Sequence, residues 1–180
     1  MEIYYQLPKY QSNISEIIVY DNEQVGIGTL QRFSHNQMSE KVVRHLSSTF
    51  VSNVRARDST SNVVYTIQLK NQFKAFVSTA EWTIEKNDQL IGSIKEKGVG
   101  RTLIIDLLNE QIKATSEITA LREIKFFQID ADQEIQIGIG KRNISIGSPQ
   151  INLDINERYT SVSPILFAAL SFVHNNQGNN

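Results

Sequence analysis

Apolar and polar positions alternate along much of the chain. Residues 63–69, 80–85 and 135–140 each place an apolar side chain at every second position. This is the period of a β-strand with one buried face. The patterns predict a chain built mainly of strands that turn their apolar faces toward a common core.

Three of the strands run into turns of similar composition. The turns contain Asn22-Glu23-Gln24, Asn87-Asp88-Gln89 and Asp130-Ala131-Asp132-Gln133, and the first two lead toward Gly28 and Gly92. Asn and Asp tolerate positive φ and hydrogen-bond their own backbone at a tight reversal. They predict a succession of hairpins, whose sheet must close or be covered because open edges aggregate. The spacing of the turns is irregular, so it does not predict a solenoid repeat.

Two segments show the pattern of a helix. Met38, Val42, Val43, Leu46 and Phe50 fall on one helix face and predict a short helix near residues 37–48.

The second segment runs from Val162 to Val173 and is apolar on all sides, as in a helix buried all round. Ser163 is suited to cap it and Pro164 to begin it, so we expect a helix from Pro164 to Val173. As a helix the segment would be about 18 Å long, too short for a hydrocarbon core of roughly 30 Å.

The 180 residues, 40% of them hydrophobic and 21% charged, are sufficient for one globular domain. We expect a single domain over residues 1–174 and a disordered polar tail over 175–180. Glu2, Pro8 and Lys9 do not fit a signal peptide, which indicates a cytoplasmic protein. The chain has no cysteine, and this excludes disulfides, thiolate metal sites and cysteine catalysis.

A fully apolar helix after a meander of hairpins needs a complete surround, which a closed barrel provides. This arrangement resembles the tubby C-terminal-like superfamily, which includes LURP-one-related proteins and phospholipid scramblases. The resemblance rests on residues 20–23 with 25–33, on 82–84 with 90–95, and on the terminal run 165–170. In these segments the chain resembles a bacterial branch of the group. It implies a closed antiparallel β-barrel of about twelve strands around a buried hydrophobic C-terminal helix.

The resemblance also shapes the functional expectation. Animal tubby proteins bind phosphoinositides and scramblases are linked to lipid movement, but no lipid-binding motif matches this chain residue by residue. We expect a non-enzymatic cytoplasmic module that binds a protein partner or anionic phospholipid headgroups, and in the second case it would be peripheral at the membrane. The alternatives are a small-ligand carrier, whose lumen the helix would fill, and a scramblase-like lipid-handling protein.

Residues suited to catalysis or metal binding are scattered. His35, His45 and His174 lie on separate elements and are expected at the surface. Asp130, Asp132 and Glu134 lack the glycine and the bidentate Glu of a calcium loop, so a solvated turn explains them better. No serine nucleophile motif is present. We therefore expect no catalytic residues, no metal and no cofactor, and we expect Trp82 in the core with its N–H bonded to a backbone acceptor.

The charges suggest one candidate surface. The formal net charge is -1, but residues 31–101 carry an excess of Lys and Arg. Barrel closure could bring a set of these cations to one end as an anion- or lipid-binding patch: Lys70, Lys74, Lys95, Lys97 and Arg101. The alternative is a set of solubilising cations interspersed with Glu81, Glu85 and Glu96. Nucleic acid is not expected as a partner, because few aromatic residues accompany the cations. The oligomeric state stays open.

Overall fold

The computed structural model describes most of the 180-residue chain. The described residues are 1–7, 15–33, 53–70, 79–97, 102–116, 122–130, 133–143 and 148–176. The expected helix near residues 37–48 lies outside them.

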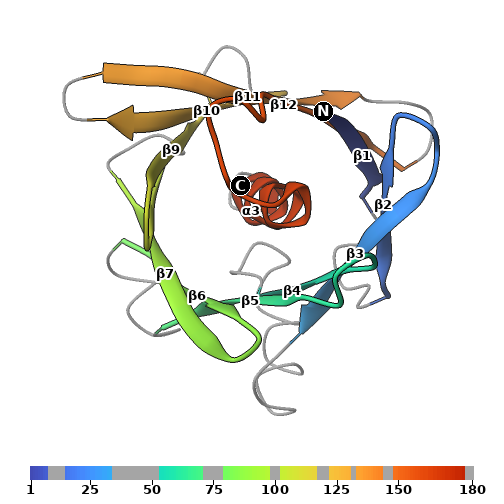
Figure 1. Cartoon of the computed structure of the whole chain (residues 1–180), viewed down its shortest axis with the longest axis horizontal. Helices are drawn as coiled ribbons and strands as arrows, with labels where there is room; N and C mark the ends of the chain where they lie inside the picture. Colours follow the sequence, from blue (N-terminus) through green and yellow to red (C-terminus); the bar gives the residue numbers. More distant parts are fainter. Residues whose placement is uncertain are drawn as a thin grey trace.

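The described residues form a closed barrel of twelve antiparallel strands in which each strand pairs with its neighbours in sequence (Figure 1). The strands are β1 (Glu2–Gln6), β2 (Ile17–Asp21), β3 (Gly26–Phe33), β4 (Asn53–Asp58), β5 (Val64–Leu69), β6 (Glu81–Lys86), β7 (Gln89–Glu96), β8 (Thr102–Leu107), β9 (Gln111–Thr115), β10 (Glu123–Asp130), β11 (Gln133–Asn143) and β12 (Gln150–Ile155). Pairing of β1 with β12 closes the barrel and leaves no open edge. The predicted barrel of about twelve strands is confirmed.

One helix, α3 (Pro164–Asn176), lies inside the barrel (Figure 1). Its N-terminus has the predicted cap, since the backbone N–H of Ile165 donates to Ser163 Oγ at 3.3 Å. From Ile165 to Val173 every side chain is buried. Phe167 meets Phe126 of β10 edge to face, with ring centroids 5.3 Å apart. The inward side chains of the strands and the apolar surface of α3 therefore form a single core.

Two buried glycines leave room for side chains inside the barrel. A Cβ on Gly28 of β3 would lie 2.5 Å from Cδ1 of Ile165, and a Cβ on Gly140 of β11 would lie 2.8 Å from Cδ2 of Leu153. Glycine at Gly28 thus makes room for the first turn of α3. At Gly140 it makes room for the neighbouring strand.

The hairpins that share similar turns also share a β-bulge. In β2–β3, β6–β7 and β10–β11 the register shifts by one residue, which leaves Ile27, Ile91 and Ile137 as the extra residues. Each is followed directly by a glycine. These hairpins are separated by equal numbers of strands, and they lie at three places around the barrel in Figure 1. The recurrence is regular in strands although it is irregular in residues, because the connecting segments differ in length.

Two of the three turns can be compared with the roles expected for Asn and Asp, because residues 131–132 of the third lie outside the described part. Asn87 and Asp88 have φ of 49° and 64° and form the two-residue loop between β6 and β7. In the β2–β3 turn Asp21 Oδ1 accepts hydrogen bonds from the backbone N–H groups of Glu23 and Val25. Gln24 takes the positive φ there, at 64°.

Two expectations need correction. Trp82 is fully buried as expected, but its indole N–H has no acceptor among the described residues. The helix ends at Asn176 instead of Val173, and Asn175 Nδ2 donates to the carbonyl oxygen of Ser171. Residues 177–180 lie outside the described part. No helix in the described ranges is long and apolar enough to span a bilayer.

Surrounding α3 with apolar wall makes its centre intolerant of charge. We expect Ala169→Asp to prevent folding, because a fully buried, unpaired carboxylate costs several kcal/mol. Ser163→Asp adds the same charge at the cap of the same helix, where a carboxylate is favourable, and should leave the barrel intact. Urea denaturation followed by tryptophan fluorescence would compare the variants. A stable Ala169→Asp protein would contradict the buried helix.

Candidate functional site

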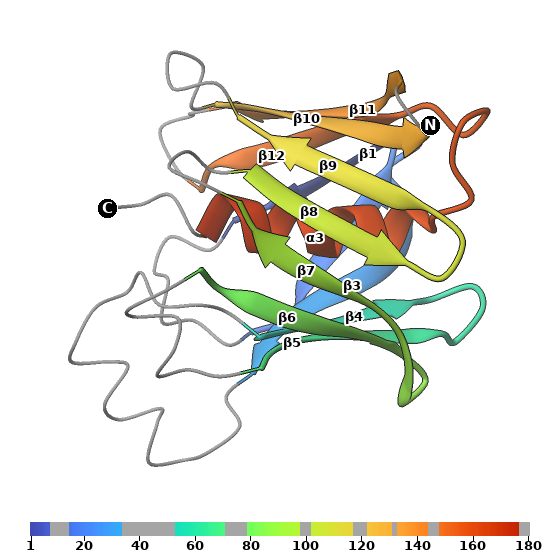
Figure 2. The same ribbon diagram turned by 90° about the vertical axis from the view of Figure 1, so that its left-hand side faces the viewer.

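The two ends of the barrel are distinguished by the direction of α3. The segment after β12 enters the helix at one end, and α3 ends at the other (Figure 2). We call these the acidic end, where α3 begins, and the basic end, where α3 ends, from the charged residues they carry.

Charged side chains are sorted along the barrel axis. The half at the basic end carries the cations Arg32, Arg55, Lys70, Lys95, Lys97, Arg122, Lys125, Lys141 and Arg142, against the acids Glu16, Glu81, Glu96 and Glu123. The half at the acidic end carries the acids Glu2, Asp21, Glu23, Asp58, Glu85, Asp88, Asp106, Glu110, Asp130, Glu134, Asp154 and Glu157, against Arg57, Lys86, Arg158, the N-terminal ammonium and, from the middle of β9, Lys113. The net charge of the chain is therefore close to zero although the two ends of the barrel carry opposite charge.

The helix dipole matches this arrangement. The N-terminus of a helix carries positive and the C-terminus negative partial charge. The described acids gather around the start of α3 and the described cations around its end. The dipole of α3 and the surface charges therefore interact favourably in the observed direction of the helix.

The structure brings the described candidate cations to the basic end. Lys70 directly follows β5, Lys95 lies near the end of β7, and Lys97 directly follows β7. Lys74 and Arg101 lie outside the described residues, as does the turn of Gly98 and Gly100. The hypothesis that barrel closure gathers these cations can be tested only for the first three residues, and these do lie at one end.

Not all of these cations are equally available. Glu81 stands between Lys70 and Lys95 on the outer face of three adjacent strands. Its carboxylate is 3.6 Å from Lys70 Nζ. No described carboxylate lies within ion-pair distance of the exposed Lys95, Lys97 or Arg122. The exposed cations at this end that have no ion pair with a described carboxylate therefore include Lys95 and Lys97 at the end of β7 and Arg122 just before β10.

Two further cations point into the mouth of the barrel. Arg32 of β3 places Cζ 5.1 Å from the centroid of the Phe172 ring. Burial lowers the pKa of Arg32 to about 10. Arg142 of β11 lies close enough to Tyr5 to act on its hydroxyl electrostatically, although burial dominates and raises the pKa of Tyr5. The Nε of Arg142 is buried and has no hydrogen-bond partner among the described residues. Charge is thus retained inside the mouth, beside the end of α3.

The last turn of α3 is held by polar contacts that the sequence did not indicate. Tyr5 Oη donates to Ser171 Oγ at 3.2 Å. His174, expected at the surface, is buried, and its Nε2 lies 3.3 Å from Ser116 Oγ. The expectation was wrong for His174 because the helix continues past it inside the barrel. His35 and His45 lie outside the described residues.

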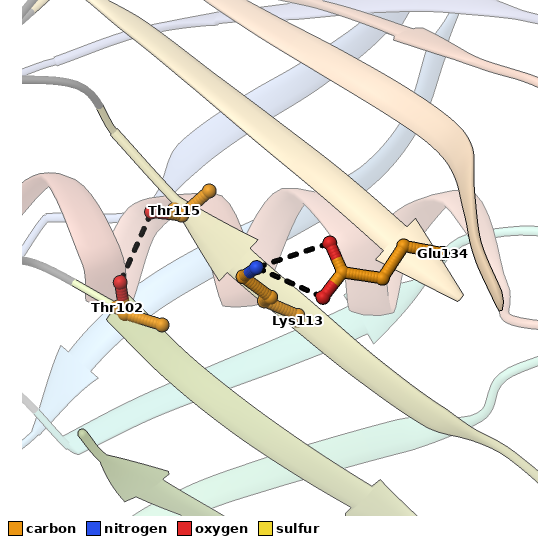
Figure 3. Close-up of polar contacts among 4 residues, drawn as sticks. All are labelled: Thr102, Lys113, Thr115 and Glu134. Carbon is orange, nitrogen blue, oxygen red and sulfur yellow. Dashed lines mark hydrogen bonds and ion pairs between the residues drawn. The ribbon is translucent and has the colours of Figure 1, made fainter. Parts of the chain in front are cut away.

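Two polar contacts join strands on the outer wall between β8 and β11 (Figure 3). Lys113 of β9 reaches across the ring of Phe127 to Glu134 of β11, with Nζ 2.9 Å and 3.0 Å from the two carboxylate oxygens. The hydroxyls of Thr102 and Thr115 join β8 to β9 at 3.0 Å. Glu134, weighed above as a calcium ligand, is instead paired with Lys113. No cluster suited to a metal ion occurs in the described part of the chain.

Comparison with known families accounts for the fold. The family described as Tubby C-terminal like domain matches residues 3–173, nearly all of the barrel and its helix. The chain belongs to this family. No curated protein and no solved structure matches it. The match confirms the resemblance inferred from the hairpins and the terminal helix of this tubby-like barrel, but it names no ligand or partner.

The buried charge of the tubby-like barrel can be tested by removing it. Because burial lowers the pKa of Arg32 to about 10, the folded state disfavours its charged form. We expect Arg32→Met, which keeps an apolar stem against Phe172, to raise the free energy of unfolding by about 1–2 kcal/mol at pH 7. The gain should shrink as the pH rises through 10, where the wild-type side chain loses its proton and the penalty is relieved.

Urea denaturation at pH 7 to 10.5 measures this difference. Arg55→Met is the matched control, since Arg55 is exposed while its Cζ lies 5.2 Å from the Phe33 ring centroid. It should be neutral or slightly destabilising. A loss of stability in Arg32→Met at pH 7 would show that the buried charge is compensated.

Proposed function

We propose that this protein is a non-enzymatic module that docks reversibly, through its basic end, on membrane surfaces rich in anionic phospholipid headgroups. The observation that carries the proposal is the separation of charge along the barrel axis. Exposed cations such as Lys95, Lys97 and Arg122 gather at one end, and most of the described acids lie in the other half.

The two charged ends of the barrel are far enough apart for salt to screen one end from a surface at the other. α3 has 13 residues and is therefore about 20 Å long. The Debye length is about 10 Å at 0.1 M salt, so charges at the acidic end are largely screened from a surface that touches the basic end. A net charge of -1 does not prevent such docking, and the charge asymmetry orients the barrel.

The magnitude fits reversible binding. Each Lys or Arg near an anionic membrane contributes about 1 kcal/mol. Several exposed cations then give an affinity that physiological salt weakens but does not abolish. The side chains of α3 from Ile165 to Val173 fill the lumen of the barrel, which argues against a small-ligand carrier.

Co-sedimentation with vesicles tests the proposal. Wild-type protein should bind vesicles of phosphatidylcholine mixed with phosphatidylserine. This binding should weaken as the salt concentration rises from 50 to 300 mM, and vesicles of pure phosphatidylcholine should not be bound. Lys95→Glu/Lys97→Glu/Arg122→Glu should reduce binding by about a hundredfold, at about 1 kcal/mol for each cation lost.

The matched control reverses the same number of charges at the other end, as Arg57→Glu/Lys86→Glu/Arg158→Glu. Both variants have the same net charge, so a change in total charge cannot separate them. The control should bind like the wild type. Equal loss in both variants, or binding that ignores salt, would refute docking through the basic end.

A further inference from the structure

The acidic end contains an open pocket of mixed polar and apolar lining beside the start of α3. The pocket has a volume of about 200 Å³. Its apolar lining comes from the strands and from the segment leading into the helix: Tyr65, Ile91, Leu107, Leu108, Val162 and Leu166. It lies at the opposite end from the surface proposed above to bind lipid.

Leu108 is an exposed leucine in the lining of this pocket, and a second exposed leucine, Leu90, directly precedes the lining residue Ile91. Leu108, in the turn between β8 and β9, is 77% exposed, and Leu90 at the start of β7 is 64% exposed. The backbone N–H of Leu108 donates to the carbonyl oxygen of Ile91 at 3.1 Å, which holds the turn against β7. Neither leucine contributes to the core, and large exposed apolar side chains beside a pocket are typical of interaction sites.

One wall of the pocket is fixed in place. Glu110 accepts hydrogen bonds from the hydroxyls of Thr160 and Ser161 through its two carboxylate oxygens, at 3.0 Å and 2.8 Å. These bonds tie the segment before α3 to the β8–β9 turn. A partner would therefore meet a preformed surface, and little ordering of this wall would accompany binding.

The charge around the pocket indicates the partner. Glu85 of β6 pairs with Leu90 of β7, and Asp88 lies in the turn that joins these two strands. Asp106 of β8 directly precedes Leu107, which lines the pocket. Lys86 is the cation among the residues that line the pocket. The surrounding end is strongly acidic, as described above, so it favours a positively charged partner and repels an anionic surface.

We propose that this pocket, with Leu108 in its lining and the exposed Leu90 next to Ile91, docks a short amphipathic protein segment that inserts leucine-sized side chains and carries Lys or Arg around them. The interaction does not depend on lipid binding. It uses the opposite end of the barrel, so the two could occur together.

Fluorescence anisotropy with a designed peptide tests this docking. The probe is an 18-residue labelled peptide of Leu and Lys, with Leu at helical spacing i, i+3, i+4 and i+7. A second peptide replaces each Lys by Glu. Wild-type protein should bind the Lys peptide, lose affinity with salt, and not bind the Glu peptide.

Paired variants locate the contact. Leu90→Ser/Leu108→Ser should weaken binding of the Lys peptide by at least tenfold, and the exposed positions should leave the fold intact. Ile18→Ser is the control, because Ile18 is 46% exposed on the outer wall and does not line the pocket. It should bind like the wild type. Equal affinity of the leucine variant and the wild type, or absence of binding to the Lys peptide, would overturn the proposal.

Two other occupants give distinct results. A lipid surface would appear as binding to pure phosphatidylcholine vesicles that the leucine variant loses. A second copy of this chain would appear as a concentration-dependent dimer in sedimentation velocity, again lost in the variant. Either result would overturn docking of a basic protein segment.

Discussion

The structure depends on the mutual burial of one apolar helix and the inner face of a closed sheet. α3 has no polar side that could face water between Ile165 and Val173. The strands in turn direct their alternating apolar side chains inward, and a twelve-stranded barrel without a filling would contain a large void. Neither element can be stable alone. Closure of β1 on β12 completes the surround and removes the last open edge.

The same arrangement determines where the charges lie. In a barrel of sequential hairpins the chain visits both ends repeatedly, so neighbouring charges in sequence separate in space. Lys86 and Lys95 both belong to the basic stretch of the sequence, yet they lie at opposite ends. The acids surround the start of the helix and the cations its end, which agrees with the helix dipole. The barrel therefore presents two chemically different surfaces on a chain with nearly balanced charge.

Local patterns were sufficient to predict most of the fold. Alternation located the strands, Asn87-Asp88 marked a two-residue turn, and the apolar run identified the buried helix. These features are fixed by a few adjacent residues. The short helix expected near residues 37–48 stays a prediction.

The candidate site was only partly predictable. The sequence indicates Lys70, Lys95 and Lys97. It does not indicate the inward Arg32 and Arg142, because a single charge in a polar strand end gives no sign of its direction. The sequence predicts a surface position for His174 for a similar reason, since the end of the apolar run gives no sign that the helix continues inside the barrel. The indole N–H of Trp82, which has no acceptor in the described part of the chain, shows that burial can be predicted where a hydrogen-bond partner cannot. The sorting of charge by end needs the register of all twelve strands.

The orientation of the barrel on a membrane tests the central claim most directly. The chain has no cysteine, so a single introduced cysteine carries an environment-sensitive dye at one known place. Gln6 at the basic end and Gln133 at the acidic end are both exposed and begin or end a strand. On vesicles containing phosphatidylserine we expect a blue shift from the dye at Gln6→Cys and none at Gln133→Cys. A shift as large at Gln133→Cys would contradict docking through the basic end.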